Sequence, residues 1–507
     1  MAASTIREIL TGSTPGRAIG APGRSWLDTP DLRDRALSVA ARLNAAGIGP
    51  GDRVGMVLKN GPEMATAFLS VTATATAAPL NPAYRAEEFA FYLGDLKPKA
   101  LIIEAGDETP ARAVAAGLDI PVISLQPLAD APAGSFSLDT GALPSVPAGQ
   151  GGPAGPEDVA LVLHTSGTTA RPKIVPLSNA NLAASARHIA GTLALGPGDV
   201  CLNIMPLFHI HGLLAAVLAS LSAGAAVCCT PGFNALRFFT WLEEVKPTWY
   251  TAVPTMHQAI LMRARSHREQ ARAAGLRFIR SSSASLPPQV MAELEEVFDA
   301  PVIEAYGMTE ASHQMASNPL PPRPRKPGHV GLAAGPEIAI MDDDGGLLPA
   351  GGIGEVVIRG PNVTRGYDNN PEANARAFTN GWFRTGDQGV LDAEGYLSLT
   401  GRLKELINRG GEKVSPLEID TVIMDHPAVA QVVTFGMPHD KLGEEVAAAV
   451  VLREGAAADE PAIRDFCAQR LAPFKVPRRV VFLAEIPKGA TGKLQRIGLA
   501  QKLGLGG

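Results

Sequence analysis

The first 150 residues alternate between two patterns of hydrophobic and polar positions. Apolar residues recur at helical spacing over residues 31–46, and Gly47 follows as a stop signal. Residues 53–58 form a short apolar run that predicts a strand, and residues 62–77, rich in alanine and threonine, predict a second helix. Because helices and strands alternate, we expect α/β layers built on a parallel sheet.

Residues 129–156 interrupt this alternation, and proline, glycine, alanine and serine dominate them. This composition predicts a long surface connection. Beyond it, an apolar run at 161–163 predicts a buried strand. The strand breaks into small residues before Pro172 and Lys173, namely Thr165, Ser166, Gly167, Thr168 and Thr169. Short hydroxyls, backbone N–H groups and one lysine are together typical of a loop that holds phosphate.

This candidate phosphate loop matches neither common nucleotide motif. The pattern G-x-x-x-x-G-K-[ST] cannot be laid on it, and it contains no G-x-G-x-x-G. A cluster of serine, threonine and glycine after a strand is also typical of an ordinary turn. The density of hydroxyls and the nearby lysine favour a nucleotide site of another kind.

Three later apolar runs also end in polar clusters. A strand predicted at 200–205 leads to His209 and His211, where a helix begins. A strand from Arg277 opens into a run of serines that includes Ser283, and residues 302–310 end in A-Y-G-M-T-E. Taken alone, the histidines could be structural and the serines a turn. The position of the serines directly after an apolar strand favours a ligand.

Length and composition limit the classes of protein to consider. A chain of 507 residues is too long for one hydrophobic core, so we expect two or more domains. With 46% hydrophobic residues, 19% charged residues and a formal charge of -5, it gives no sign of a nucleic-acid partner. We find no apolar run of about 18 residues and no export segment, and we therefore expect a cytoplasmic protein without a membrane partner.

The cysteines are scattered, without C-x-x-C spacing and without a neighbouring histidine at ligand distance. They are Cys201, Cys228, Cys229 and Cys467. This pattern predicts reduced, buried thiols in an intracellular protein and argues against a zinc site.

Four motifs resemble those of a known superfamily. T-S-G-T-T-A-R-P-K, A-Y-G-M-T-E, G-W-F-R-T-G-D and P-K-G-A-T-G-K are similar to motifs of the adenylate-forming enzymes, which include acyl-CoA synthetases, peptide-synthetase adenylation domains and firefly-type luciferases. The resemblance implies an α/β fold with a large N-terminal domain of layered α/β subdomains and a small mobile C-terminal α+β domain. It also implies an AMP-forming acid–thiol ligase that uses ATP, Mg²⁺ and coenzyme A.

The resemblance also assigns roles to residues. Glu310 would hold Mg²⁺, Tyr306 would stack on adenine, and Asp387 with Arg402 would bind the ribose hydroxyls. Lys493 would reach the reacting phosphate from the C-terminal domain. The expected catalytic residues are Lys493, His209 and Thr309, and the expected ATP and AMP contacts are Thr165, Ser166, Gly167, Thr168, Thr169, Lys173, Ala305, Tyr306, Gly307, Thr309, Asp387, Arg402 and Lys493.

The same resemblance divides the chain into domains. Lys404 matches the hinge of the C-terminal domain, so we expect an N-terminal core at 1–401, a hinge at 402–404 and a lid domain at 405–507. Rotation about the hinge would withdraw Lys493 and bring Gly410 and Gly411 to the active site, where glycines leave room for a pantetheine arm. We see no carrier-protein domain, and free coenzyme A is therefore the expected thiol.

After residue 160 the resemblance narrows to the oxalate–CoA ligases of plants and fungi. The segments P-L-F-H-I-H-G-L-L, T-W-Y-T-A-V-P-T and E-A-Y-G-M-T-E-A-S-H-Q-M carry it, and they imply that His209, Ser283 and His313 contact oxalate. Oxalate keeps a second carboxylate after the first is activated, and burying that group unpaired would cost several kcal/mol. His313 lies three residues after Glu310, one turn away if this segment is helical, and can donate a hydrogen bond or carry a charge.

Alternatives stay open at this point. His313 could orient Glu310 rather than bind the acid, and the role of His211 is undecided. The enzyme could be a short- or medium-chain acyl-CoA synthetase for another acid, or the chain could bind nucleotide without catalysis, which the full set of motifs argues against. Ile174 and Gln388 depart from the residues usual in the superfamily, although neither replaces a catalytic group.

Overall fold

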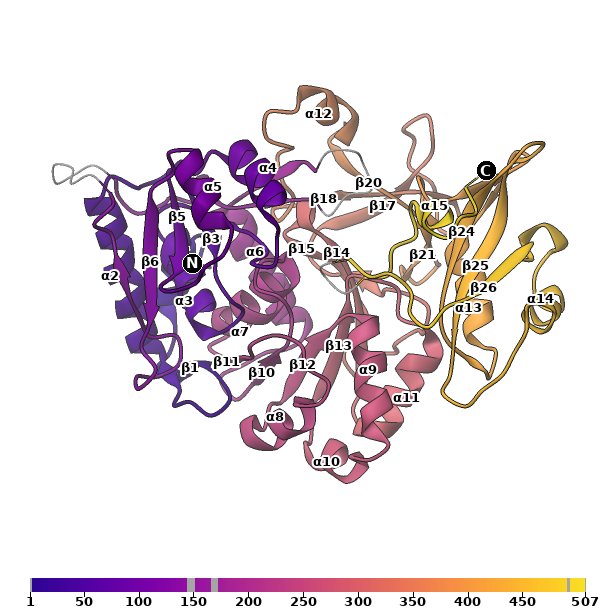
Figure 1. The fold of residues 1–507 in the computed structure, drawn as a ribbon, viewed down its shortest axis with the longest axis horizontal. Coiled ribbons are helices and arrows are strands. Elements are labelled where there is room, and N and C mark those ends of the chain that lie inside the picture. Colours follow the sequence, from indigo (N-terminus) through magenta and orange to yellow (C-terminus); the bar gives the residue numbers. More distant parts are fainter. Residues whose placement is uncertain (1, 144–150, 166–171, 490–492, 507) are drawn as a thin grey trace.

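The computed structural model describes residues 2–143, 151–165, 172–489 and 493–506. The strands in this part of the chain form four sheets, and the N-terminal and C-terminal regions lie at opposite sides of the molecule (Figure 1). The predicted α/β class, with a large N-terminal part and a smaller C-terminal part, is confirmed. None of the described helices combines the length and the apolar character needed to cross a membrane.

A seven-stranded sheet lies in the N-terminal region, in the order β7-β6-β5-β3-β4-β8-β9. The inner strands are parallel, and β7 and β9 pair antiparallel at the two edges. Helices in the crossovers leave the inner strands largely buried, which explains their continuous apolar runs. The elements are α2 (Thr29–Ala45), β3 (Arg53–Val57), α3 (Pro62–Thr72), β4 (Thr76–Pro79), α4 (Ala86–Leu96), β5 (Ala100–Glu104), α5 (Ala111–Gly117), β6 (Val122–Pro127), β7 (Phe136–Asp139), β8 (Val159–His164) and β9 (Ile174–Ser178).

A nine-stranded sheet forms the centre, in the order β16-β15-β14-β13-β12-β10-β11-β1-β2. Strands β10 to β14 run parallel, and β15 turns back antiparallel against β14. The elements are α1 (Ile6–Gly12), β1 (Arg17–Gly20), β2 (Leu27–Asp28), α6 (Asn179–Thr192), β10 (Val200–Asn203), the π-helix η1 (His211–Leu218), α7 (Ala219–Ser222), β11 (Ala226–Cys229), α8 (Phe238–Val245), β12 (Trp249–Ala252), α9 (Pro254–Ala264), α10 (Arg268–Ala273), β13 (Phe278–Ser282), α11 (Pro288–Phe298), β14 (Val302–Met308), the 3₁₀ helix η2 (Thr309–Ala311), β15 (His313–Ser317) and β16 (Leu332–Ala333).

Two five-stranded sheets complete the described chain. The first contains β17 (Glu337–Met341), β18 (Ile353–Arg359), β19 (Phe378–Thr379), β20 (Trp382–Leu391) and β21 (Leu397–Arg402), with α12 (Pro371–Ala377). The second contains β22 (Ile407–Arg409), β23 (Glu412–Val414), β24 (Val429–His439), β25 (Gly443–Leu452) and β26 (Arg479–Phe482), with α13 (Pro416–Met424), α14 (Glu460–Ala468), the 3₁₀ helix η3 (Pro473–Lys475) and α15 (Leu499–Lys502).

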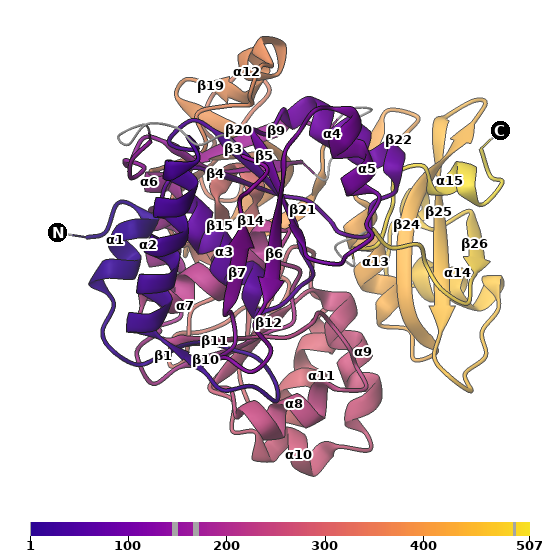
Figure 2. The same ribbon diagram turned by 60° about the vertical axis from the view of Figure 1, so that its left-hand side comes forward.

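The chain changes sheets between β21 and β22, close to the predicted hinge. Figure 2 shows the C-terminal sheet at one side of the molecule, beyond β21. Arg496 pairs with Glu405 in the segment after β21 (3.3 Å) and with Asp420 on α13 of the same region (2.7 Å). The domain limits at 1–401, 402–404 and 405–507 stay a prediction.

Several predicted elements are confirmed and two are wrong in part. Helix α2 and strand β3 match the predicted helix and strand, and all four cysteines are free and buried. The helix predicted at 62–77 ends at Thr72, because residues 76–79 form strand β4, which is fully buried between β3 and β8. The predicted surface connection at 129–156 contains β7, and Ala133 and Ser135 before it are buried.

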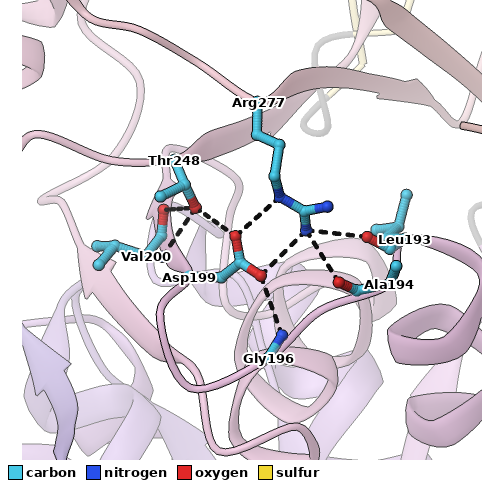
Figure 3. Close-up of polar contacts among 7 residues, drawn as sticks. All are labelled: Leu193, Ala194, Gly196, Asp199, Val200, Thr248 and Arg277. Carbon is cyan, nitrogen blue, oxygen red and sulfur yellow. Dashed lines mark hydrogen bonds and ion pairs between the residues drawn. The ribbon is translucent and has the colours of Figure 1, made fainter. Parts of the chain in front are cut away.

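A polar network aligns the starts of three central strands (Figure 3). Asp199, Thr248 and Arg277 are the residues immediately before β10, β12 and β13. The Asp199 carboxylate accepts from Nε and Nη2 of Arg277, both at 3.0 Å, and from the Thr248 hydroxyl at 2.8 Å. Arg277 also donates to the carbonyls of Leu193 and Ala194 after α6. The network fixes the amino ends of β10, β12 and β13, and two of these strands, β10 and β13, lead to polar clusters at their carboxyl ends.

Candidate active site

The carboxyl ends of β10, β13 and β14 carry the residues singled out in the sequence. His209 follows β10, Ser283 follows β13 directly, and Tyr306 with Thr309 lies at the end of β14. The ends of neighbouring parallel strands meet at one edge of a sheet, where ligands of α/β proteins commonly bind. This topology brings together residues that are far apart in the sequence.

The described part of the phosphate loop is its base, between β8 and β9. The backbone N–H of Thr165 donates to the carbonyl of Lys173 (2.8 Å), and the N–H of Lys173 donates to the Thr165 hydroxyl (3.1 Å). These bonds hold the two ends of the loop together. The remaining loop residues predicted to hold phosphate lie outside the described residues, namely Ser166, Gly167, Thr168 and Thr169.

A buried carboxylate lies beside this loop. Glu310 in η2 is 6% exposed, and its Oε1 accepts a hydrogen bond of 2.9 Å from the Tyr367 hydroxyl. The Tyr367 ring also lies 4.1 Å from the ammonium of Lys173. Burial raises the pKa of Glu310, and the Tyr367 hydrogen bond and the Lys173 charge oppose this rise. Tyr367 thus connects the lysine of the phosphate loop to the carboxylate, a role that the sequence analysis missed.

A second carboxylate lies where β14 faces β20 and β21. Asp387 on β20 pairs in register with Arg402 on β21, and its Oδ1 lies 3.2 Å from Nε of Arg402. The hydroxyl of the buried Tyr306 donates to the other oxygen of Asp387. The three side chains therefore form one cluster, and Ala305 and Gly307 flank Tyr306 on β14.

Lys493 reaches the same region from the C-terminal part of the chain. Burial and the neighbouring Arg402 lower the pKa of Lys493 to about 8, against the opposing effects of Asp387 and Glu310. Together with burial, the Lys493 charge lowers the pKa of His209 to about 3. Both carboxylates and the histidine therefore lie within electrostatic range of one ammonium.

A group of uncharged polar side chains, which we call the pocket residues, lies within electrostatic range of Lys493. His211 Nδ1 lies 3.0 Å from the Ser283 hydroxyl, and the His211 ring centre is 4.9 Å from that of His313. His209 is linked to them by the backbone N–H of His211, which donates to His209 Nδ1 (3.3 Å). Burial lowers the pKa values of His211 and His313 well below the ordinary value for histidine. The sequence analysis expects His313 either to donate a hydrogen bond or to carry a charge. This buried environment favours the neutral, hydrogen-bonding form.

A sharp turn, and not a helix, brings His313 into the pocket. Helix η2 ends at Ala311, and Ser312 and His313 have φ values of 49° and 94° at the start of β15. The helical turn considered between Glu310 and His313 is therefore not formed. A Cβ on Gly307 would lie 1.8 Å from the carbonyl oxygen of His313, so glycine is needed for this approach. His313 is 2% exposed, and its Nδ1 has no hydrogen-bond partner among the described atoms.

The predicted coenzyme A residues lie elsewhere. Gly410 and Gly411 form the exposed turn between β22 and β23, with φ values of 62° and 98°. Lys404 contributes to the lowering of the Lys173 pKa, after burial, and so lies near the phosphate loop. The structure thus brings the described nucleotide and acid residues together, and the glycine turn lies apart from them between β22 and β23.

The donor set fits a magnesium ion carried by a nucleotide. Hard cations prefer carboxylate and phosphate oxygens, and Mg²⁺ in nucleotide sites commonly takes only one or two protein carboxylates. Glu310 supplies one such carboxylate, and the described residues contain no group of three or more His, Cys, Asp or Glu side chains that could hold a metal ion unaided. The remaining ligands would be phosphate oxygens and water.

Comparison with known proteins agrees with this arrangement. Residues 14–368 match the family model of AMP-binding enzymes, and residues 418–493 match that of the AMP-binding enzyme C-terminal domain. The oxalate–CoA ligase of Arabidopsis thaliana is 49% identical over 96% of this chain and 95% of its own length. The oxalate–CoA ligase of Saccharomyces cerevisiae is 42% identical over 89% of this chain and 86% of its own length. The resemblance stated from the motifs is confirmed.

Solved structures show the same fold. ATP-bound MatB from Rhodopseudomonas palustris, 32% identical, superposes with a TM-score of 0.89 over 98% of both chains. The apo form of MatB from the same organism gives a TM-score of 0.79, so the present structure is closer to the ATP-bound arrangement. The two family matches, the shared fold and the high identity over nearly the whole chain show that this protein belongs to the family of AMP-binding enzymes.

Proposed function

We propose that the protein is an ATP-dependent oxalate–CoA ligase. It would convert oxalate and ATP into oxalyl-AMP and pyrophosphate, and then oxalyl-AMP and coenzyme A into oxalyl-CoA and AMP. The observation that carries the proposal is the cluster of uncharged polar side chains formed by His211, Ser283 and His313, within electrostatic range of Lys493. The similarity of the whole chain to two oxalate–CoA ligases supports the choice of acid.

In the first half-reaction, a carboxylate oxygen of oxalate attacks the α-phosphorus and pyrophosphate leaves. The loop from Thr165 to Thr169 and Lys173 would hold the phosphates, and Lys493 would stabilise the charge that develops on their oxygens. Glu310 would hold Mg²⁺, which when bound neutralises part of the phosphate charge. No nucleophilic side chain is needed.

The rest of the nucleotide would lie along β14 and β20. We assign the ribose hydroxyls to Asp387 and Arg402, whose carboxylate can accept from both hydroxyls while the guanidinium donates. Tyr306, between Ala305 and Gly307, would stack on adenine. Thr309 at the start of η2 would bind a phosphate oxygen.

In the second half-reaction, the thiolate of coenzyme A attacks the acyl carbon and AMP leaves with the bridging oxygen. We infer that the structure has the arrangement suited to the first half-reaction, and the electrostatic coupling of Lys493 to Glu310 and the higher similarity to ATP-bound MatB support this inference. Rotation about Lys404 would replace Lys493 with the turn at Gly410 and Gly411.

The pocket favours a short, polar acid over a fatty acid. His209, Ser283 and His313 would bind the oxalate carboxylates by hydrogen bonds from neutral groups. The unpartnered Nδ1 of His313 is the kind of buried polar atom that a ligand is expected to satisfy. An alkyl chain cannot form a hydrogen bond with this nitrogen. A fatty acid would therefore leave His313 and the neighbouring donor groups without partners.

A panel of acids tests the proposal. Pyrophosphate release and acyl-CoA formation are measured with oxalate, malonate, acetate and octanoate, and oxalate is expected to give the highest kcat/KM. His313→Ala should raise the KM for oxalate, whereas the control His329→Ala, which removes a histidine outside the site, should not. Turnover of another acid in preference to oxalate would contradict the choice of substrate, and no turnover with any acid would contradict a ligase.

A further inference from the structure

Arg280 is a fully buried cation that the proposed reaction has not used. It lies on β13 with an exposed fraction of 0%. Its Nη1 lies 3.4 Å from His211 Nε2, its Nη2 donates to Oε1 of Gln314 (3.2 Å), and its Nε has no hydrogen-bond partner among the described atoms. Within the described chain, no carboxylate pairs with it. A buried charge with only neutral partners is costly, and a bound anion nearby would offset that cost.

The contacts of Arg280 favour one tautomer of His211. A guanidinium can only donate, so its 3.4 Å contact favours an unprotonated Nε2 on His211, whose single lone pair Arg280 and the Thr251 hydroxyl (2.6 Å) then share. The proton of the neutral imidazole is therefore on Nδ1, which donates to the Ser283 hydroxyl at 3.0 Å. Since Ser283 accepts from His211, its own proton is directed away from His211 and is available to a ligand.

The charge of Arg280 reaches both pocket histidines. After burial, it is among the groups that lower the pKa values of His211 and His313. It therefore favours the neutral imidazoles that can accept from one side and donate on the other. An anion bound beside these histidines would lie close to a cation that no carboxylate of the described residues neutralises.

We propose that Arg280 makes the pocket selective for acids that carry a second anionic group next to the reacting carboxylate. It acts as a positioning residue, since it sets the donor direction of Ser283 through His211, and its charge attracts the second carboxylate. The inference rests on the proposed function, because oxalate is the acid in which the second carboxylate adjoins the first.

Binding of two matched acids tests the inference. Oxamate has the size and shape of oxalate but carries a neutral amide in place of the second carboxylate. Dissociation constants of both acids are measured by calorimetry on the full chain, with an ATP analogue bound that cannot be cleaved between the α- and β-phosphates. The variant is Arg280→Met, and the control is Arg277→Met, which removes an arginine next to the same strand but outside the pocket.

The wild-type protein should bind oxalate more tightly than oxamate, by about tenfold or more. Arg280→Met should weaken oxalate by about tenfold or more and oxamate by much less, whereas Arg277→Met should change both by the same factor. Equal weakening of both acids by Arg280→Met would overturn the inference and leave the proposed function in place. A wild-type protein that binds acids but not oxalate would overturn the proposed function.

A measurement on the wild-type protein covers the case in which Arg280→Met does not fold. Nitrogen-15 spectra of the labelled histidines, with the His211 signal assigned from His211→Asn, report which ring nitrogen carries the proton. We expect a neutral His211 protonated on Nδ1, and oxalate should shift this signal more than oxamate does. Protonation on Nε2 would overturn the inference.

Discussion

Replacing Tyr367 with phenylalanine removes a single hydrogen bond from the candidate site. The Tyr367 hydroxyl donates to Glu310 Oε1 at 2.9 Å, and its ring lies 4.1 Å from the Lys173 ammonium. Tyr367→Phe keeps the ring and its contact with the lysine. The expected defect is therefore confined to the carboxylate that we assign to Mg²⁺.

The size of the effect follows from the charge of the acceptor. A hydrogen bond to a charged group is worth about 1.5–3 kcal/mol, and about 1.4 kcal/mol corresponds to a factor of ten. We expect kcat/KM for ATP at limiting Mg²⁺ to fall by about tenfold to a hundredfold. Burial already raises the pKa of Glu310, and loss of the hydroxyl raises it further. Because a protonated carboxyl group holds Mg²⁺ poorly, the defect should grow as pH falls and shrink as Mg²⁺ is increased.

Tyr396→Phe is a matched control for this variant. The Tyr396 hydroxyl also donates to a protein oxygen, the carbonyl of Pro324 at 2.7 Å, and its ring also lies under a lysine, with Lys326 at 4.2 Å. The assay measures initial rates of pyrophosphate release over a range of Mg²⁺ concentrations at two pH values. Tyr396→Phe is expected to depend on Mg²⁺ as the wild-type protein does. If Tyr367→Phe shows the same dependence, the assignment of Glu310 is refuted.

Three further predictions concern different parts of the molecule. The pKa of Lys493 is about 8 and the ammonium is the active form, so kcat/KM for ATP should fall as pH rises through about 8, and a profile that is flat there would contradict its role. Arg277→Met should lower the free energy of unfolding by about 1–3 kcal/mol in a denaturant titration, because it leaves the Asp199 carboxylate without its cation. Gly307→Ala should reduce oxalate turnover by about tenfold or more, since the added Cβ would displace His313, and unchanged rates would count against this contact.

The motifs predicted the family, whereas periodicity predicted only some of the elements. The roles assigned to the site residues stay predictions. Helix α2 has clear helical spacing and was placed correctly. Strand β4 was assigned to a helix because a fully buried strand of small residues has no alternation, and β7 was missed because its flanking residues have the composition of a loop. These errors concern segments whose structure depends on tertiary neighbours.

The missed site residues also depend on long-range contacts. Tyr367 meets Glu310 across 57 positions in the sequence, and no local pattern distinguishes it from a core aromatic residue. Arg280 could have been identified as a candidate site residue from the sequence, since an arginine inside an apolar strand is rarely buried without a partner. His313 was predicted from resemblance, but the left-handed backbone at Ser312 and His313 that turns it into the pocket could not be.

The transfer of an oxygen atom tests the central proposal most directly. If a carboxylate oxygen of oxalate attacks the α-phosphorus and the thiol later attacks the acyl carbon, the bridging oxygen stays with AMP. With oxalate labelled with oxygen-18 on its carboxylates, mass spectrometry of the products should find one labelled oxygen in each AMP and none in pyrophosphate. Unlabelled AMP, or label in a phosphate released with ADP, would contradict an oxalyl-AMP intermediate.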